Sequence, residues 1–535
     1  MHDFLLSIGY NNWILPTLLA LPLVGALLVV FTGRRGEEGE DEVASGAARG
    51  PRVLATAVFA LEFILSLGLW WAFDPSYEGW QQSFDRAWIP TWGIRFTLGL
   101  DGIALMMVLL TTFIMLLASY GSFTSIRRKA RSYYALLLLL TTGMLGVFMA
   151  LDLFLFYVMW EAMLIPMYFI VGIWGGERRI YASLKFFIYT MVGSLLMLVG
   201  IVYLGTHQPL TTVNGIVTSV PNFSYDAALN TAQFTQRGAL WLFGAFFLAF
   251  AVKVPMFPLH TWLPDAHVEA PTAGSVVLAS IMLKLGTFGF LRLAVPLFPT
   301  AAMHPAVRTA VLVLAVVGIV YGALVSLVQP DFKKLVAYSS VSHLGFVMLG
   351  IFALTVQSVQ GALMVMINHG LSTGALFFLI GMIYERRHTR LIESYGGIAR
   401  AVPMFATLLT IVSLSSIGVP GTNGFVGEFL VLIGAFRTTP VMTLIATTSV
   451  IIAAAYLLWA IQRILFNPLD KPENEHIPDL NRRELLLMAP LMAGIIWLGV
   501  YPAPVLRRME VSAETFVRTV QTRAAQRTAL AGQER

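Results

Sequence analysis

Seven stretches of about twenty residues contain no Asp, Glu, Lys or Arg, and they constrain the fold more than any other feature of the sequence. The hydrocarbon core of a bilayer requires about 20 apolar residues per helix, so each stretch predicts a transmembrane helix. Strands of a membrane barrel would alternate apolar and polar residues over about ten positions, and these stretches do not alternate. They cover residues 13–33, 103–126, 132–151, 186–206, 309–330, 438–462 and 485–506.

Further long apolar stretches carry one or two ionisable residues each, which gives a prediction of about fourteen transmembrane helices in an all-α polytopic membrane protein. Only 12% of the residues are charged, against about 25% in a typical soluble chain. The first apolar stretch lacks a basic region before it and an Ala-x-Ala site after it, so we expect a retained helix and not a signal peptide. The absence of cysteine excludes thiolate metal sites, Cys-ligated iron–sulfur clusters and disulfides.

The distribution of Lys and Arg among the loops predicts the orientation in the membrane. Counted between the fourteen expected spans, the odd loops hold twenty-one of these residues and the even loops five. Basic loops remain cytoplasmic, so both termini are expected on the outer side. The charged segment 33–50 is predicted to be a flexible loop without chemistry. Residues 513–530 have a weak amphipathic pattern that would suit a surface helix.

Ionisable side chains within the expected spans are candidates for function, because a charge at the helix centre costs about 2.5 to 3.5 kcal/mol. Lys253 is followed two residues later by Pro255, which must interrupt the hydrogen bonds of its helix. Glu428 follows a similar interruption at Pro420. Broken helices expose backbone dipoles at the depth where transporters place ion sites. The six candidates for proton transfer are Glu161, Lys253, Lys284, His343, His369 and Glu428.

Each candidate also has a structural interpretation. A lysine near a helix end can extend its amine to the membrane surface, and a lone buried histidine is often only hydrogen-bonded in the core. Lys185 is expected to reach the surface in this way, Glu62 to face the bundle without titrating, and Arg292 to have either a structural or a lipid-headgroup role. The polar run 260–269 matches no zinc spacing and is interpreted as a cap between two spans, so we expect no metal site.

The two broken helices lie five spans apart, and an odd offset implies opposite orientation. Inverted repeats with interrupted helices at corresponding positions indicate an ion pathway at mid-membrane depth. We therefore expect two five-helix units, 133–297 and 298–466, the second beginning its first helix near Pro305. Residues 1–132 would form three preceding helices, and residues 467–535 a last helix and a tail.

Several motifs resemble the subunit M and chain 4 family, the antiporter-like subunits of the proton-pumping NADH-quinone oxidoreductase, complex I. They are VKVPMFPLHTWLPDAHVEAPTAGSVVLASIMLK, YSSVSHLGF, INHGLSTGALFFLIGMIYERRHTR and GVPGTNGFVGEF. The resemblance covers about residues 101–466. It implies a fourteen-helix proton-translocating subunit of NADH:quinone oxidoreductase that carries out no redox chemistry, in the bacterial inner membrane. NADH, FMN, iron–sulfur clusters and quinone would bind to other subunits, and this chain would have no cofactor.

The resemblance also implies a role for each candidate residue. Glu161 would modulate Lys253, the central proton-holding lysine, and Lys284 would connect that lysine across the centre. His343 and His369 would extend the path, and Glu428 would be its terminal site. Related antiporter-like chains generally have Lys where this chain has Glu428. The expected partners are other membrane subunits and the lipid bilayer, with no nucleic acid.

Three other functions remain open from the sequence. The chain could belong to a multisubunit sodium/proton antiporter or to a membrane-bound hydrogenase, since related chains occur in both. It could also be a structural anchor whose buried charges are inert. An anchor would tolerate neutral substitutions of Lys253, Lys284 and Glu428 in its function, whereas a proton-translocating subunit would not.

Overall fold

The computed structural model describes residues 1–32, 41–207, 211–213, 216–218, 221–231 and 235–533, and most of them are helical. Within these ranges twelve segments are long and apolar enough to cross a membrane. They are α2 (Tyr10–Phe31), α3 (Arg49–Ala72), α4 (Gly102–Gly121), α5 (Ala130–Met149), α6 with α7 (Leu153–Trp174), α8 (Arg179–Thr206), α12 to α14 (Thr272–Leu297), α16 (Pro305–Leu327), α17 (Phe332–Ala353), α18 (Val356–Arg387), α21 with a π-helical end (Pro440–Phe466) and α23 (Arg482–Val500).

Two further apolar segments are each broken into two helices. The first consists of α10 (Gln236–Lys253) and α11 (Trp262–Glu269), and the second of α19 (Pro403–Ile417) and α20 (Asn423–Phe436). In the second break Gly418 and Gly421 have φ of 86° and 90°, values in the left-handed region that favour glycine. The all-α polytopic fold predicted from the sequence is confirmed, and twelve spans plus two broken segments are consistent with fourteen.

Polar side chains fix where several spans begin. Asp152 accepts hydrogen bonds from the backbone N–H groups of Phe154 and Leu155 at the start of α6. Asp331 accepts from the Lys334 N–H at the start of α17, and Asn481 forms a reciprocal capping box with Glu484 at the start of α23. The first turn of a helix has N–H groups without partners, so these side chains end the loops and set the helix register.

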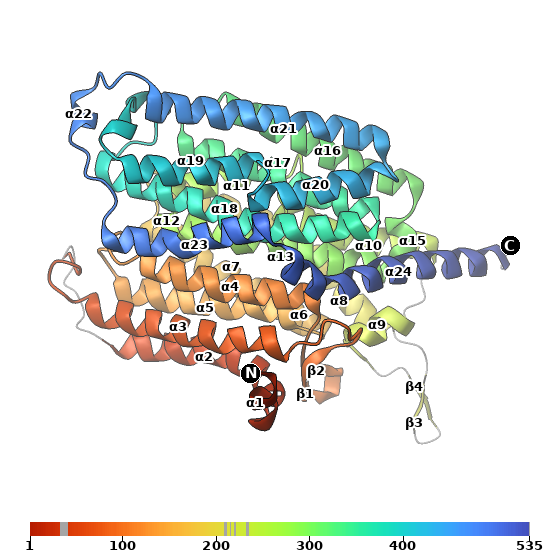
Figure 1. Cartoon of the computed structure of the whole chain (residues 1–535). Coiled ribbons are helices and arrows are strands. Elements are labelled where there is room, and N and C mark those ends of the chain that lie inside the picture. Colours follow the sequence, from red (N-terminus) through yellow and green to blue (C-terminus); the bar gives the residue numbers. More distant parts are fainter. Residues whose placement is uncertain (33–40, 208–210, 214–215, 219–220, 232–234, 534–535) are drawn as a thin grey trace.

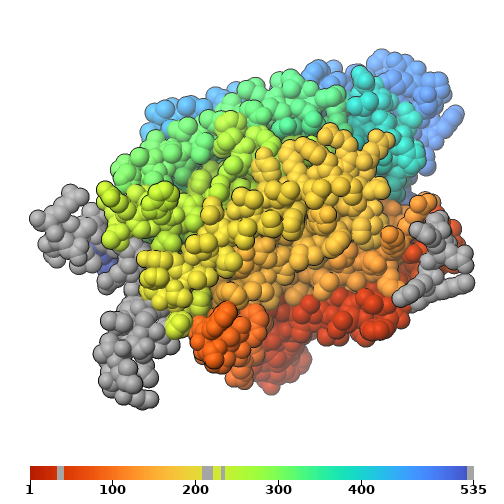
Figure 2. Space-filling model, turned by 180° about the vertical axis from the view of Figure 1, so that it is seen from behind, coloured from red at the N-terminus to blue at the C-terminus, as the bar shows by residue number. Residues whose placement is uncertain are grey.

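The helices run side by side along one common direction, and the chain builds the bundle in layers. Figure 1 shows the N-terminal helices α2 to α5 on one flank and α16, α17, α19 and α21 on the other. In Figure 2, seen from behind, the colours follow the same order from red through yellow and green to blue. The middle of the bundle is therefore formed mostly by segments from the middle of the sequence, and α23 also lies there, against α4, α18 and α20.

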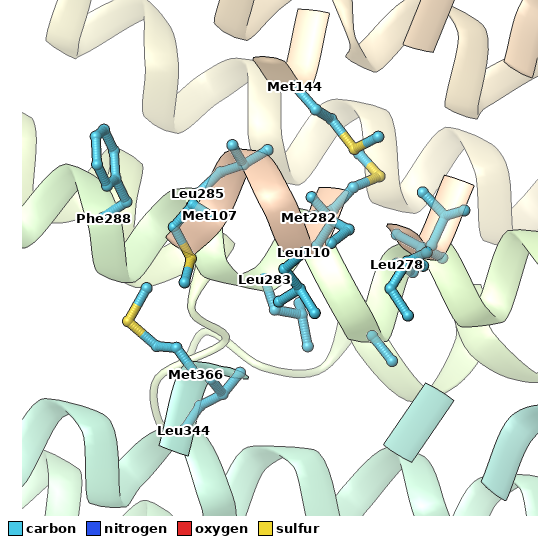
Figure 3. Packing of buried hydrophobic residues seen from close by; sticks show 14 of the residues in the cluster. Met107, Leu110, Met144, Leu278, Met282, Leu283, Leu285, Phe288, Leu344 and Met366 are labelled. Carbon is cyan, nitrogen blue, oxygen red and sulfur yellow. The ribbon is translucent and has the colours of Figure 1, made fainter. Parts of the chain in front are cut away.

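In two spans, Thr272–Leu297 and Val356–Arg387, every residue of the most apolar 18-residue stretch is buried. The first is built from α12 (Thr272–Val277), α13 (Leu283–Gly289) and α14 (Val295–Leu297), joined by π-helical turns at Leu278–Met282 and Phe290–Ala294. Figure 3 shows Leu and Met side chains from this span among Met107, Leu110 and Met144 of α4 and α5 and Leu344 and Met366 of α17 and α18. Any polar group inside this region must therefore find its partners within the protein.

The elements outside the spans gather mostly at one end of the bundle (Figure 1). The C-terminal helix α24 (Ala503–Gln533) packs against the bundle through Met509, Ala513 and Val520. The amphipathic helix expected at 513–530 is therefore present, and it packs against protein. Of the charged loop expected at 33–50, residues 33–40 lie outside the described part of the chain. The remaining elements are α1 (His2–Ser7), β1 (Gln81–Ile89), β2 (Ile94–Leu100), β3 (Thr211–Val213), β4 (Ile216–Thr218), α9 (Tyr225–Thr231), α15 (Pro299–Ala302), α22 (Pro472–Glu475) and α24 (Ala503–Gln533).

The antiparallel β1–β2 hairpin carries an ion pair between Asp85 and Arg95, with 2.5 Å between Nη2 and Oδ2. Hydrogen bonds from Arg95 hold the pKa of the Asp85 carboxyl below its usual value. A carboxyl whose pKa falls on folding stabilises the folded form at neutral pH, and this contribution is lost as the pH falls through the folded pKa. We therefore expect amide hydrogen exchange in residues 81–100, corrected for intrinsic rates, to increase as the pH is lowered from about 6 towards and below about 3.9, the ordinary carboxyl pKa.

The Asp85→Asn variant provides the control for this prediction. It should exchange faster than the parent at about pH 6, and its protection should change little with pH, because its side chain does not titrate in this range. Equal protection of the hairpin in parent and variant at about pH 6 would contradict the prediction.

Candidate functional site

Four of the six candidate residues form a continuous line of contacts inside the bundle. The Lys284 Nζ lies 2.6 Å from the His369 Nδ1. The rings of His369 and His343 have their centroids 5.7 Å apart, and the His343 Nδ1 lies 2.7 Å from a carboxylate oxygen of Glu428. The four side chains come from α13, α18, α17 and α20 in that order. Residues that are distant in the sequence are thus brought into one buried row.

The first π-helical turn positions the Lys284 amine. Lys284 is completely buried, and its Nζ donates a hydrogen bond of 2.5 Å to the carbonyl of Ala279 within that turn. Ser280, in the same turn, donates to the carbonyl of Gly370, next to His369. A π-turn changes the hydrogen-bond register of a helix and is frequent at functional sites. Here it holds Lys284 against α18 at the level of His369.

A small polar cavity lies beside the two histidines and Glu428. Its space open to water is about 20 Å³, enough for one water molecule. Ser372 and Ser415 line it and are hydrogen-bonded to each other at 2.7 Å, and Ser415 donates to the Asn423 side chain. Hydroxyl and imidazole groups both donate and accept hydrogen bonds. The cavity can therefore hold water in contact with the row of titratable groups.

Glu161 and Lys253 form a second group. Lys253 is completely buried, and among the described residues its Nζ has no hydrogen-bond partner. It lies over the rings of Trp160 and Phe186, at 5.7 and 5.1 Å from their centroids, and interacts electrostatically with the half-buried Glu161. Aromatic faces attract a cation but replace only part of its hydration. The charge of Lys253 therefore depends strongly on the position of the Glu161 carboxylate.

The two groups meet where α10 ends against α13. A Cβ on Gly286 would lie 2.8 Å from the backbone nitrogen of Val254 and 2.9 Å from the carbonyl oxygen of Phe250. The backbones of α10 and α13 are thus in direct contact at Val254, the residue after Lys253, and at Gly286, two residues after Lys284. Within the described part of the chain, no direct hydrogen bond joins the two amines.

Two further buried groups, His267 and Lys333, lie close to this row. His267 is completely buried and stacked on Phe377 with 4.7 Å between ring centroids, and neither ring nitrogen has a hydrogen-bond partner in the described structure. It interacts electrostatically with both Lys284 and Lys333. The Lys333 Nζ donates at 2.6 Å to the carbonyl of Ala270, at the end of α11. Lys333 also lines a cavity of about 550 Å³.

Neither residue is among the six candidates that the sequence suggests. His267 lies in the run 260–269, which predicts a cap between spans, and Lys333 is one of the twenty-one basic residues of the odd loops. One signal was available for Lys333, since it follows Asp331, a residue type that commonly begins a helix, by only two positions. That spacing puts the amine in the first turn of the span.

The secondary candidates have individual partners. Lys185 forms a 2.7 Å ion pair with Asp265, a partner that the sequence does not indicate, and its extension to the membrane surface stays a prediction. Arg292 pairs with Asp101 at 2.6 Å and stacks over Trp80, which supports a structural role. Glu62 is completely buried as expected. Among the described residues no group of three or more His, Asp or Glu side chains could hold a metal ion.

Comparisons with known proteins agree on one family. A family model described as "NADH:quinone oxidoreductase/Mrp antiporter, TM" matches residues 150–453, more than half of the chain. NADH-quinone oxidoreductase subunit M of Rhodobacter capsulatus is 45% identical, over 90% of this chain and 92% of that protein. NADH-ubiquinone oxidoreductase chain 4 of Marchantia polymorpha is 38% identical, over 95% and 97%.

A solved structure agrees with these relatives. A chain of respiratory complex I from Thermus thermophilus with bound NADH superposes with a TM-score of 0.81 at 32% identity, over 95% of this chain and 99% of that chain. Of the functions left open by the sequence, the named relatives favour the oxidoreductase over the separate antiporter. The chain therefore belongs to the antiporter-like membrane subunits of complex I, the family of subunit M and chain 4.

Proposed function

We propose that this chain moves protons across the membrane along Lys284, His369, His343 and Glu428, with Glu161 and Lys253 controlling the supply of protons to this row. The observation that carries the proposal is the unbroken series of contacts from Lys284 to Glu428. Each neighbouring pair joins a group that can release a proton to one that can accept it. The one-water cavity beside the histidines supports transfer between the two rings, whose centroids are 5.7 Å apart.

The Glu161 and Lys253 pair can act as the switch. A nearby carboxylate favours the charged lysine, and burial favours the neutral one. Moving Glu161 away from Lys253 would therefore release a proton, and moving it back would allow Lys253 to take up another. Moving one charge against 100 mV costs about 2.3 kcal/mol, and a pKa shift of about two units is worth roughly 2.7 kcal/mol. A small rearrangement of the pair is on the required scale.

His267 and Lys333 would supply a side branch to the row. The cavity at Lys333 is also lined by Glu269 and Glu385, so space for water and titratable groups lie together at that end of the bundle. His267 interacts electrostatically with both Lys333 and Lys284, so it connects this cavity with the row. Under the orientation predicted from loop charges, this end faces the cytoplasm. We infer that protons are taken up from this side.

The remaining parts of the proposal concern the setting of the chain. It would lie in the bacterial inner membrane with both termini on the outer side, next to other antiporter-like subunits of the complex. NADH, FMN, iron–sulfur clusters and quinone would bind in other subunits, and this chain would contribute no redox step. Its two proton-handling halves would be 133–297 and 298–466, each containing one of the broken helices, between 1–132 and 467–535.

Replacing Glu428 by Gln in the intact complex tests the proposal. The amide keeps the shape of the side chain but cannot carry a proton along the path. We therefore expect NADH-driven proton pumping into proteoliposomes to fall at least about tenfold. This is less than the full effect of a positioned proton-transfer group, because the Glu428 side chain is 12% exposed. Pumping is followed with a pH-sensitive dye, and assembly by the yield of complex. The exposed Glu393→Gln should pump normally. Normal pumping by an assembled Glu428→Gln complex would refute the proposal.

A further inference from the structure

An apolar groove runs between α3, α4 and α23 on the outside of the bundle. It has a volume of about 530 Å³ and is lined by side chains such as Phe63, Leu67, Phe113 and Trp497. Its floor includes Leu371 of the enclosed helix α18. Figure 1 shows α3, α4 and α23 running in the same direction, with α24 following α23 at one end. The groove is thus parallel to the spans and open to their surroundings.

The length of the groove matches one leaflet of a bilayer. Along α3 it extends from Phe63 to Trp71, which at 1.5 Å per residue is about 12 Å. Half of a hydrocarbon core of about 30 Å is about 15 Å. A transmembrane helix of a neighbouring protein would need a contact surface through both leaflets, and this groove provides only one. An acyl chain extends over a single leaflet and suits it better.

The end of the groove near α24 has the composition of a membrane interface. Trp71 and Trp497 are 46% and 44% exposed, and tryptophan is concentrated at the level of lipid headgroups. Arg508 lies over the ring of Trp70 at 3.5 Å and donates to the Trp70 carbonyl, and the neighbouring Arg507 is exposed. Two arginines at this level attract an anionic headgroup.

We propose that this groove binds one anionic phospholipid, with an acyl chain between α3, α4 and α23 and the headgroup phosphate at Arg507 and Arg508. The apolar walls match the chain, and the basic end matches the phosphate. A bound lipid would cover part of α18, the helix that carries His369, between α4 and α23. The site is distinct from the proton-transfer row and does not depend on the proposed function.

Photolabelling of the intact complex tests this site. The probe is phosphatidylglycerol with a diazirine in one acyl chain, and the labelled peptides are identified by mass spectrometry. We expect labelling of residues 490–498, reduced at least about threefold by Ala493→Phe, which places a ring in the groove from an exposed position. Ile496→Phe is the matched control, because Ile496 is 49% exposed on the same helix but does not line the groove.

The headgroup is tested separately, without a change that could affect folding of the core. Unlabelled phosphatidylglycerol should compete with the probe at least about threefold better than phosphatidylcholine of the same chain length, and Arg507→Gln should reduce this preference. Equal competition by both lipids would overturn the anionic assignment. Labelling that is the same in parent, Ala493→Phe and Ile496→Phe, or an Ala493→Cys cross-link to another subunit, would overturn the lipid site itself.

Discussion

Replacing Lys253 by Met in the intact complex is expected to lower NADH-driven proton pumping about a hundredfold, the lower end of what a positioned proton-transfer group contributes. Lys253 is completely buried, with two aromatic rings and the Glu161 carboxylate as its electrostatic neighbours. Methionine is similarly long and flexible but cannot hold a proton, so the bundle remains filled while the switch is lost. Pumping is measured in proteoliposomes, together with NADH oxidation in the presence of an uncoupler.

The control for Lys253→Met is the loss of the same charge elsewhere. Arg437→Met removes a cation from an exposed position after α20 and should leave pumping unchanged. Lys253→Arg keeps a charge that proteins do not deprotonate, so it should also fail to pump. The result for Lys253→Arg separates a proton-exchanging amine from a merely structural cation, which arginine could replace. Pumping at the parental rate by either variant of Lys253 would contradict its assignment as the switch.

The spans could be predicted from the sequence because they depend on local composition. Charge-free runs of sufficient length specify membrane helices, and Pro255 and Pro420 specify the two breaks. The candidate residues could be named for a related reason, since an ionisable group within an apolar run is costly wherever the run lies in the fold. Neither inference requires knowledge of which helices are neighbours.

The contacts between candidates could not be predicted in this way. Lys284 and His369 are separated by 85 residues, and so are His343 and Glu428. The same holds for Lys185, whose ion-pair partner Asp265 lies 80 residues away. The surroundings of His267 could not be predicted either, because Asp265 and Glu269 lie near it in the sequence, whereas its neighbours in space include Phe377. Helix packing determines all of these contacts, and helical periodicity alone does not determine packing.

Close packing of α18 against α20 places Glu428 within reach of His343, and Gly427 is one of the glycines that permit it, with Gly361 and Gly434. A Cβ at Gly427 would lie 2.8 Å from the backbone nitrogen of Val365 and 3.1 Å from the Asn368 side chain. Small residues of this kind allow membrane helices to approach closely. Gly427→Leu must therefore push α20 away from α18. We expect it to reduce proton pumping at least about tenfold with Glu428 still present, and to destabilise the subunit by about 1 to 3 kcal/mol, as overpacking does.

Gly244→Leu provides the matched control for this prediction. Gly244 lies in α10, is exposed, and has nothing within 4 Å of a built Cβ, so the same substitution adds bulk there without moving a helix. Pumping and the midpoint of thermal inactivation of the intact complex are measured for both variants. If Gly427→Leu lowers thermal stability but pumps normally, then the 2.7 Å contact between His343 and Glu428 is not required for transfer. If it assembles and loses pumping while Gly244→Leu pumps normally, the position of Glu428 is itself part of the proton path.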